Sequence, residues 1–308
     1  MRGAGLEATS QRFVGVSLRA RFRTRLAGLD HALPAMQLWH KAKKLGVWDP
    51  CDIDLLHDTR DWALLPEPER DVLLRLTALF EAGGEGIARD LLPLIAVMAD
   101  EQRLEEELYL TSFLLEEAKH FEMFRRFLDE VAKESGDLSR YHTPSWQRIF
   151  LGELPRATRR LKECGSPEAQ AEASVTYNMV VEGVLAATGY YAYQTTLVRN
   201  GILPGMQQAL AHLLLDESRH LAYGVFLLSR LVAEHGEGVW LAIERRMGEL
   251  LEPALGVITE AFAAYPVMPF GLDVAEFTEF ATAQFRTRLA RIEQARGKSV
   301  ADISAAPV

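Results

Sequence analysis

The sequence predicts an all-α protein built on four long helices. Apolar residues recur at spacings of three and four along extended stretches, and no window shows the period-two alternation of β-branched residues that is typical of strands. The motif Glu-x-x-His also occurs twice, one hundred residues apart, each time inside an apolar helical stretch. The predicted fold is therefore a long helical bundle that encloses a polar site.

The predicted helices are bounded by ordinary start and stop signals. Proline at Pro68 favours a first turn there, and Ser166 followed by Pro167 is typical of a capped helix start. Asn200-Gly201 and His235-Gly236 are stop signals. The predicted helices cover residues 68–99, 101–134, 166–198, 203–234, 237–264 and 273–295, with a loop at 136–155 that contains a short helix near 146–150. Helices of roughly 30 residues are about 45 Å long, which favours a long bundle.

The chain divides into three parts. Residues 1–45 are predicted to form an N-terminal arm, which is rich in Arg at its start and has no sustained period. Residues 46–300 are predicted to form the bundle, and residues 301–308 a C-terminal tail.

The composition excludes several classes of protein. The chain has 308 residues and 48% hydrophobic content, which suffices for one large core. A net charge of −9 argues against a nucleic-acid-binding surface. No apolar run reaches the roughly 18 residues of a membrane span, and the N-terminus lacks the apolar segment of a signal peptide. We therefore expect a cytoplasmic protein with no transmembrane segment, in which Cys51 and Cys164 are free thiols.

The two Glu-x-x-His motifs predict a metal site. Glu117 and His120 share one helix face with apolar residues, and Glu217 and His220 repeat this arrangement. Burying an unpaired carboxylate costs several kcal/mol or shifts its pKa strongly, so these side chains need a partner. A metal ion is the simplest partner. Dinuclear carboxylate bundles combine two such motifs with one Glu from each of the two other helices.

The two additional carboxylates are sought on the third and first helices. On the third helix, Glu182 lies on a face of small and apolar residues, 35 residues before Glu217. The equivalent position on the first helix falls in residues 81–85, where Glu85 is the preferred candidate and Glu81 the alternative. Gly83, Gly84 and Gly86 would each cost about 1 kcal/mol in a helix, which suggests a π-bulge, a close helix approach, a bound molecule or a loose turn there.

Four Glu and two His form a hard, oxygen-rich ligand set that suits Fe and Mn. Two such ions with open positions can bind and reduce dioxygen inside an apolar lining. Leu, Phe, Ala and Gly are abundant around the third and fourth helices, so an apolar pocket is also expected there.

Four stretches resemble the ligand-binding oxidases related to the small subunit of ribonucleotide reductase. They are WDPCDID at 48–54, EEAKH at 116–120, SVTYNMVVEGVLAATGYY at 174–191 and DESRH at 216–220. The resemblance implies a ferritin-like homodimer with a heterodinuclear Mn/Fe centre that reacts with dioxygen, di-iron being the alternative. It also implies a long-chain fatty acid bound at the metals. The family's ligands correspond to Glu117, His120, Glu182, Glu217 and His220.

The resemblance further implies an ether cross-link between a tyrosine and a residue of the first helix. Tyr177 matches the tyrosine, and Ile87 stands where the family has valine. The family's first-helix Glu ligand corresponds to Gly84 here, with Glu85 one place further on. In an ideal helix Tyr177 would lie about 140° around the axis from Glu182, so both can reach the metals only if the helix is distorted or the phenol bends around.

Two other functions remain open at this point. One is the radical-generating small subunit of ribonucleotide reductase, which would need an aromatic residue in a C-terminal tail; the tail GKSVADISAAPV has none. The other is a non-catalytic protein that binds metal or fatty acid after losing its first-helix ligand at Gly84. The expectation is a dioxygen-activating oxidase.

Overall fold

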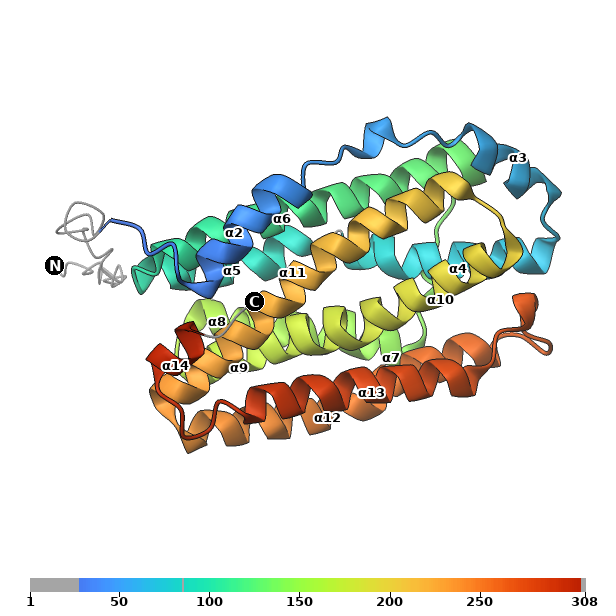
Figure 1. The fold of residues 1–308 in the computed structure, drawn as a ribbon. Helices are drawn as coiled ribbons and strands as arrows, with labels where there is room; N and C mark the ends of the chain where they lie inside the picture. Colours follow the sequence, from blue (N-terminus) through green and yellow to red (C-terminus); the bar gives the residue numbers. More distant parts are fainter. Residues whose placement is uncertain (1–27, 85, 306–308) are drawn as a thin grey trace, which may run out of the picture.

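The computed structural model describes residues 28–84 and 86–305, and every regular element in this part of the chain is a helix. The long helices run side by side along the molecule, and short helices close its ends (Figure 1). The α-helices are α2 (Pro34–Leu45), α3 (Leu56–Leu64), α4 (Glu67–Gly84), α5 (Ile87–Asp100), α6 (Leu104–Arg126), α7 (Pro144–Gln147), α8 (Leu154–Glu163), α9 (Pro167–Ser174), α10 (Ala187–Asn200), α11 (Pro204–His235), α12 (Glu237–Ala263), α13 (Val274–Glu293) and α14 (Val300–Ser304). The predicted all-α, ferritin-like bundle is confirmed.

Three π-helices and three 3-10 turns complete these elements. The π-helices are η2 (Phe127–Ala132), η4 (Arg148–Glu153) and η5 (Val175–Ala186), and the 3-10 turns are η1 (Pro50–Asp52), η3 (Ser139–Tyr141) and η6 (Pro269–Gly271). The longest π-helix, η5, continues directly from α9 and into α10, so these three elements form one long rod.

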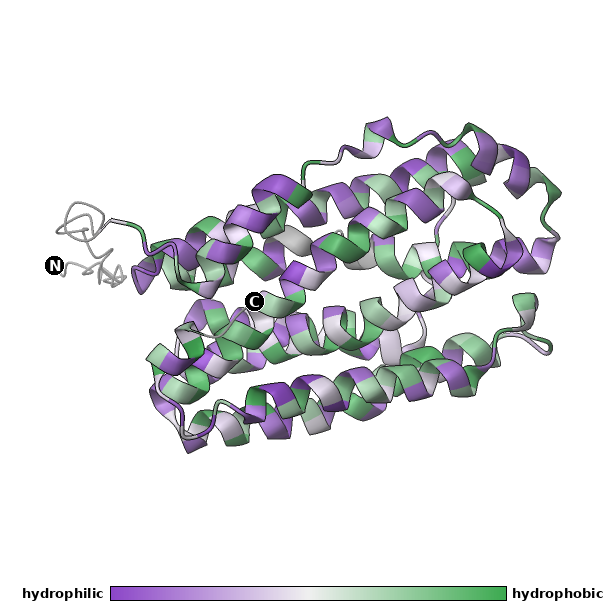
Figure 2. Ribbon diagram, in the orientation of Figure 1, coloured by the Kyte–Doolittle hydropathy of each residue, from purple (hydrophilic) through white to green (hydrophobic). Residues whose placement is uncertain are grey.

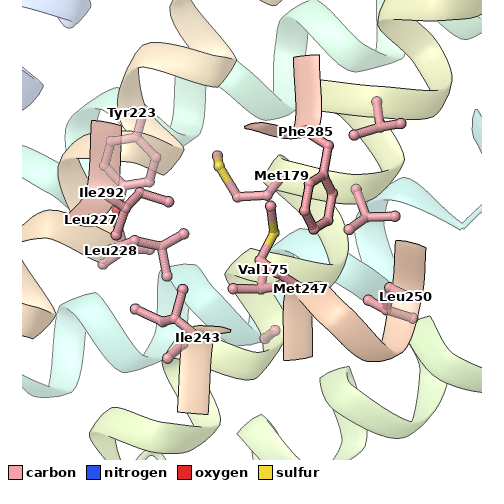
Figure 3. Close-up of a cluster of buried hydrophobic side chains, with 14 of the residues drawn as sticks. Val175, Met179, Tyr223, Leu227, Leu228, Ile243, Met247, Leu250, Phe285 and Ile292 are labelled. Atoms are coloured by element: carbon pink, nitrogen blue, oxygen red, sulfur yellow. The ribbon is translucent and has the colours of Figure 1, made fainter. Parts of the chain in front are cut away.

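One part of the hydrophobic core lies between this rod and the C-terminal helices α11, α12 and α13. Figure 3 shows side chains of η5, α11, α12 and α13 meeting in one cluster, among them Met179, Leu227, Met247 and Phe285. Burying each such side chain contributes about 1.5–3 kcal/mol to folding. Figure 2 shows hydrophilic and hydrophobic residues alternating along the long helices, which is typical of amphipathic helices with one face in a core.

Several predicted helix ends are confirmed. The hydroxyl of Ser166 accepts a hydrogen bond from the backbone N–H of Ala169 and caps α9. Gly201 ends α10 at φ 62°, a left-handed conformation that glycine adopts without strain. α12 and α13 agree with the two C-terminal helices that the sequence predicts. Both cysteines are exposed free thiols, as expected.

The first long helix is not continuous, and its prediction as one element at 68–99 was wrong. α4 ends at Gly84 and α5 begins at Ile87, with a turn at Gly86. Three glycines within four residues lower the helix propensity enough to favour a break. The first-helix segment that was expected to supply a ligand is therefore the junction of two helices.

Three further segments differ from the sequence prediction. Residues 34–45, assigned to the N-terminal arm, form α2, which packs against α6 and α11 and buries Leu38. Residues 144–163, assigned in part to a loop, form α7, η4 and α8. In the C-terminal tail, α14 packs on α11 and buries Ile303. The part of the arm at 1–27 lies outside the described residues. Across residues 28–84 and 86–305, no helix has both the length and the hydropathy of a membrane span.

Candidate metal centre

Five side chains from three elements meet in the interior of the bundle. Glu117 and His120 come from α6, Glu182 from η5, and Glu217 and His220 from α11. All five are buried. Donor atoms of Glu117, Glu182, Glu217 and His220 all lie within 4.8 Å of one another. The structure thus brings together five of the six residues that the sequence predicts as metal ligands.

Both imidazoles turn Nδ1 toward the carboxylates. The distance from His220 Nδ1 is 3.1 Å to Glu117 Oε1 and 3.7 Å to Glu182 Oε1. His120 Nδ1 lies 3.6 Å from Glu217 Oε1, and the other oxygen of Glu217 lies 3.7 Å from His220 Nδ1. Glu217 therefore faces both histidines and belongs to both halves of the cluster.

The atoms that face the centre of the cluster have no hydrogen-bond partner in the described part of the chain. They are Glu117 Oε1, His120 Nδ1, Glu182 Oε1, Glu217 Oε2 and His220 Nδ1. Buried polar atoms are almost always bonded, so five such atoms around one space require a common partner. Carboxylate oxygens and imidazole nitrogens are the ligands that iron and manganese prefer. These residues therefore fit a metal centre.

Each histidine is held in place by an acid from the other motif. Asp216, next to Glu217, lies 3.2 Å from His120 Nε2, and Glu116, next to Glu117, lies 3.0 Å from His220 Nε2. Such outer carboxylates fix the orientation of a metal-binding imidazole and raise its basicity. The sequence analysis missed both acids, although an acidic residue directly before each ligand Glu was the available signal.

A buried arginine links the two outer acids. Arg219 donates to Glu116 Oε1 at 2.5 Å and also to Asp216 Oδ1. Asp216 Oδ2 also accepts a hydrogen bond from Trp48 Nε1 at 2.8 Å, and Lys119 Nζ lies 3.5 Å away. The WDPCDID stretch thus contacts the site through its first residue.

The charges in the cluster shift the pKa values of its members in opposite directions. Burial alone would lower the pKa of His120, but Asp216 and Glu217 outweigh it and raise that pKa to about 9. Burial raises the pKa of Glu182 well above its usual range, and the neighbouring Glu217 adds to the shift. Burial would also raise the pKa of Glu217, yet the two imidazoles lower it to about 2. A metal that binds here must displace protons from the histidines.

The π-helix explains how Tyr177 and Glu182 can face the same site. In η5 the hydrogen bonds run from residue i to residue i+5, so residues five apart lie on one face. Both side chains line the same cavity. Burial raises the pKa of the Tyr177 phenol well above its usual range, and the charges of Glu117 and Glu182 add to this. Of the two alternatives that the sequence left open, a distorted helix or a bent phenol, the structure shows a distorted helix.

The first-helix candidates are not part of the described cluster. Glu85 lies outside the described residues, as does the side chain of Ile87. Gly84 is the last residue of α4. Glu81, the alternative ligand, forms an ion pair with Arg125 at 3.1 Å. The described structure therefore supplies no carboxylate from α4 or α5 to the five-residue cluster.

An apolar cavity extends from the cluster. Its volume is about 150 Å³. Its polar end is formed by Glu117, His120, Glu182 and Glu217, and its walls by residues such as Phe80 and Phe124. Gly189 allows Phe80 to pack there, because a Cβ at Gly189 would lie 2.6 Å from the Phe80 ring. The expected apolar pocket is present and ends at the candidate metal ligands.

Comparisons with known proteins agree with this geometry. The family model for the small chain of ribonucleotide reductase matches residues 33–294. The R2-like ligand-binding oxidase from Sulfolobus acidocaldarius is 35% identical, and the match covers 93% of this chain and 99% of that one with a TM-score of 0.85.

Two further similar structures are of proteins with a metal cofactor. One is a mutant R2-like ligand-binding oxidase with anaerobically reconstituted Mn/Fe cofactor, 36% identical, with 89% of this chain and 98% of that chain covered and a TM-score of 0.84. Another mutant, with aerobically reconstituted Mn/Fe cofactor, gives the same values. The chain therefore belongs to the ribonucleotide reductase small-chain family, and within it to the R2-like ligand-binding oxidases, which are oxidoreductases.

Proposed function

We propose that this protein is a dioxygen-activating oxidase with a Mn/Fe centre at Glu117, His120, Glu182, Glu217 and His220. The observation that carries the proposal is the set of five unbonded donor atoms at the end of an apolar cavity. The Mn/Fe cofactors of its relatives support the choice of metals. When bound, a Mn/Fe pair would supply reduction of dioxygen and removal of hydrogen from an unactivated C–H bond.

The protein's own residues set the conditions for that chemistry. Asp216 and Glu116 hold the Nε2 side of each imidazole, which leaves Nδ1 free to bind a metal. Glu217 faces both histidines and would help to hold the metals in either half of the cluster. The aromatic walls of the cavity exclude water, so an oxidising species would meet the bound ligand rather than solvent.

A long-chain fatty acid is the proposed ligand. Its carboxylate suits the metal end of the cavity, and its chain suits the apolar walls. A cavity needs about 10–15 Å³ to hold one water molecule. A volume of 150 Å³ therefore holds on the order of ten methylene-sized groups. Extraction of the purified protein with organic solvent, followed by mass spectrometry, identifies the ligand.

Tyr177 and Ile87 are the proposed partners of an ether cross-link. The new bond would join the phenol oxygen to Cβ of Ile87, with loss of the phenol hydrogen and the Cβ hydrogen. Dioxygen would accept the two electrons and two protons. The position of Tyr177 on the cavity wall supports its part in this reaction. A peptide that joins residues 87 and 177, two hydrogen masses lighter than its parts, would identify the product.

Glu85 is the proposed sixth ligand. In the sequence it stands between Gly84, the last residue of α4, and Gly86, which precedes α5. Glu85→Gln should weaken metal binding at one of the two metal positions and leave binding at the other position unchanged.

The deciding experiment combines crystallography with a reaction. Anomalous diffraction above and below the Fe and Mn edges on aerobically reconstituted crystals should show two metals in the five-residue cluster, and the reconstituted protein should consume dioxygen. Metal binding without dioxygen consumption would favour a non-catalytic binding protein. A long-lived tyrosyl radical with no cross-link would instead favour a radical-generating ribonucleotide reductase subunit.

A homodimer is the proposed assembly, since the resemblance implies one. Sedimentation velocity of the metal-loaded protein should give twice the mass of 34.5 kDa. A single-chain mass at every concentration would exclude it.

A further inference from the structure

A second pocket lies on another face of the bundle, between α11, α13, α14 and the start of α2. Its volume is about 550 Å³. It shares no lining residue with the cavity at the metal centre. A molecule bound in this pocket would therefore be distinct from the ligand at the metal centre.

The charged groups that line this pocket are all cationic. They are Arg288, Arg291 and Lys298, and no Asp or Glu lines the pocket. In the described part of the chain no ion pair joins any of the three to a carboxylate. The chain as a whole carries a net charge of −9. The pocket is thus electropositive within an acidic protein, which favours an anionic occupant.

Arg288 is the innermost of these cations. It is half-buried, and its Nε has no hydrogen-bond partner among the described residues. Its Nη1 donates to the backbone oxygen of Gln284 at 3.0 Å and to Gln284 Oε1 at 2.6 Å. Burial lowers the pKa of its guanidinium to about 10, and the charge of Glu182 opposes this shift. A partly desolvated cation without an anion is costly, and a bound anion would remove that cost.

The backbone of η5 is shaped to accept Arg288. A Cβ at Gly183 would lie 2.6 Å from Arg288 Nε and 2.8 Å from its Cδ. Any larger residue at 183 would force the arginine away from the rod. The glycine therefore allows the Arg288 side chain to pack against the backbone of η5.

The remaining walls of the pocket are both polar and apolar. Ser229, Gln284 and Gln294 offer hydrogen bonds to an anion, while Leu221, Val225, Phe226 and Ile303 form an apolar side. A small inorganic anion would use only part of this surface. An amphiphilic anion would use all of it.

We propose that this pocket binds an organic anion, with its phosphate or carboxylate group held by Arg288, Arg291 and Lys298 and its apolar part against Phe226 and Ile303. Three cations that form no ion pair with a carboxylate among the described residues, together with the apolar side of the pocket, carry this assignment. The site is independent of the fatty-acid cavity, and its ligand need not be a substrate.

The test is calorimetric titration of the full-length, metal-loaded protein with decyl phosphate, decanoate and inorganic phosphate. Decanoate can also enter the cavity at the metals, so variants of the pocket decide the assignment. Arg288→Gln and Arg291→Gln should each weaken the component due to the pocket by about tenfold or more, because each removes a charge-assisted hydrogen bond. Lys298→Gln, which alters an exposed residue, provides a variant with little risk to folding.

Arg286→Gln is the matched control, since Arg286 is exposed on the same helix and does not line the pocket. It should change the affinity less than twofold. The amphiphile whose binding depends on Arg288 and Arg291 identifies the headgroup. Three results would overturn the proposal: no anion binds in a way that these variants weaken, inorganic phosphate binds as tightly as the amphiphiles, or affinity falls as protein concentration rises because a second copy covers the pocket.

Discussion

The two Glu-x-x-His motifs are alike in sequence, yet their histidines have different surroundings. Asp216, which holds His120, also accepts hydrogen bonds from Trp48 and Arg219 and lies near Lys119. His220 stacks on Phe113 with 3.7 Å between ring centroids. Arg219 joins the outer acids of both imidazoles, but only on the His120 side does this polar network extend to Trp48 and Lys119, and only His220 stacks on Phe113.

This difference shows how a sequence repeat can produce two unlike metal positions. The donor atoms that the motifs offer are the same, and the outer residues set the charge and the rigidity around each imidazole. A centre with two different metals needs such an asymmetry.

Glu217→Ala should have the largest effect, because Glu217 faces both histidines. We expect both metal positions to be lost together, with metal content near zero by elemental analysis. Glu279→Ala, an exposed change on α13, should retain full metal content. Retention of one metal in Glu217→Ala would show that the two halves do not share this ligand.

Replacing the outer acids should separate the two halves. Asp216→Asn should weaken metal binding at His120, and Glu116→Gln should weaken it at His220, each by about 10–100-fold. Anomalous diffraction on crystals of each variant shows which position empties. Loss at the histidine of the same motif, rather than of the opposite one, would contradict the crosswise arrangement of these acids.

The stability of the metal-free protein should fall as the pH rises. The pKa of His120 is about 9 in the folded chain, above its ordinary value of 6.5, so its stabilising charge is fully present below pH 6.5 and lost by about pH 9. The loss should be at most about 3 kcal/mol in the free energy of unfolding. Urea titrations at pH 6 and pH 9 measure it.

The matched variants for this pH effect are His120→Gln and His57→Gln. The first should remove most of the slope, and the second, at an exposed histidine, should keep it. Greater stability of the metal-free wild type at pH 9 than at pH 6 would contradict the assignment.

Trp48→Phe should have the smallest effect. It removes one hydrogen bond to Asp216 and leaves the other donors in place. Metal affinity at His120 should fall by about three- to tenfold, which corresponds to one hydrogen bond, and that at His220 should not change. An equal loss at both positions would mean that the two surroundings are not independent.

Much of the bundle could be predicted because local signals agreed with the fold. Ser166 caps the start of α9, and Gly201 and Gly236 end α10 and α11, as the sequence predicts. The apolar faces that carry Glu117 and Glu217 pointed both residues inward. The spacing of apolar residues along a single helix is enough to predict which of its faces is buried.

The remaining features depend on contacts between distant segments or on competing local energies. The pairing of Asp216 with His120 spans 96 residues, so no local pattern shows it. The burial of α2 depends on the surfaces of α6 and α11. At residues 83–86 the sequence showed that glycine disfavours a helix, but not whether the chain would bulge or break.

The π-helix η5 has a consequence for the motions of the metal-free protein. Its wide turns are rare and less well bonded than ordinary helical turns, and its carboxylate Glu182 repels Glu117 and Glu217 when no cation lies between them. Backbone amides of residues 175–186 should then exchange with deuterium faster than those of α9 and α10 on either side. Metal binding should slow that exchange, so the metal centre would stabilise the π-helical hydrogen bonding of η5, which carries one of its own ligands.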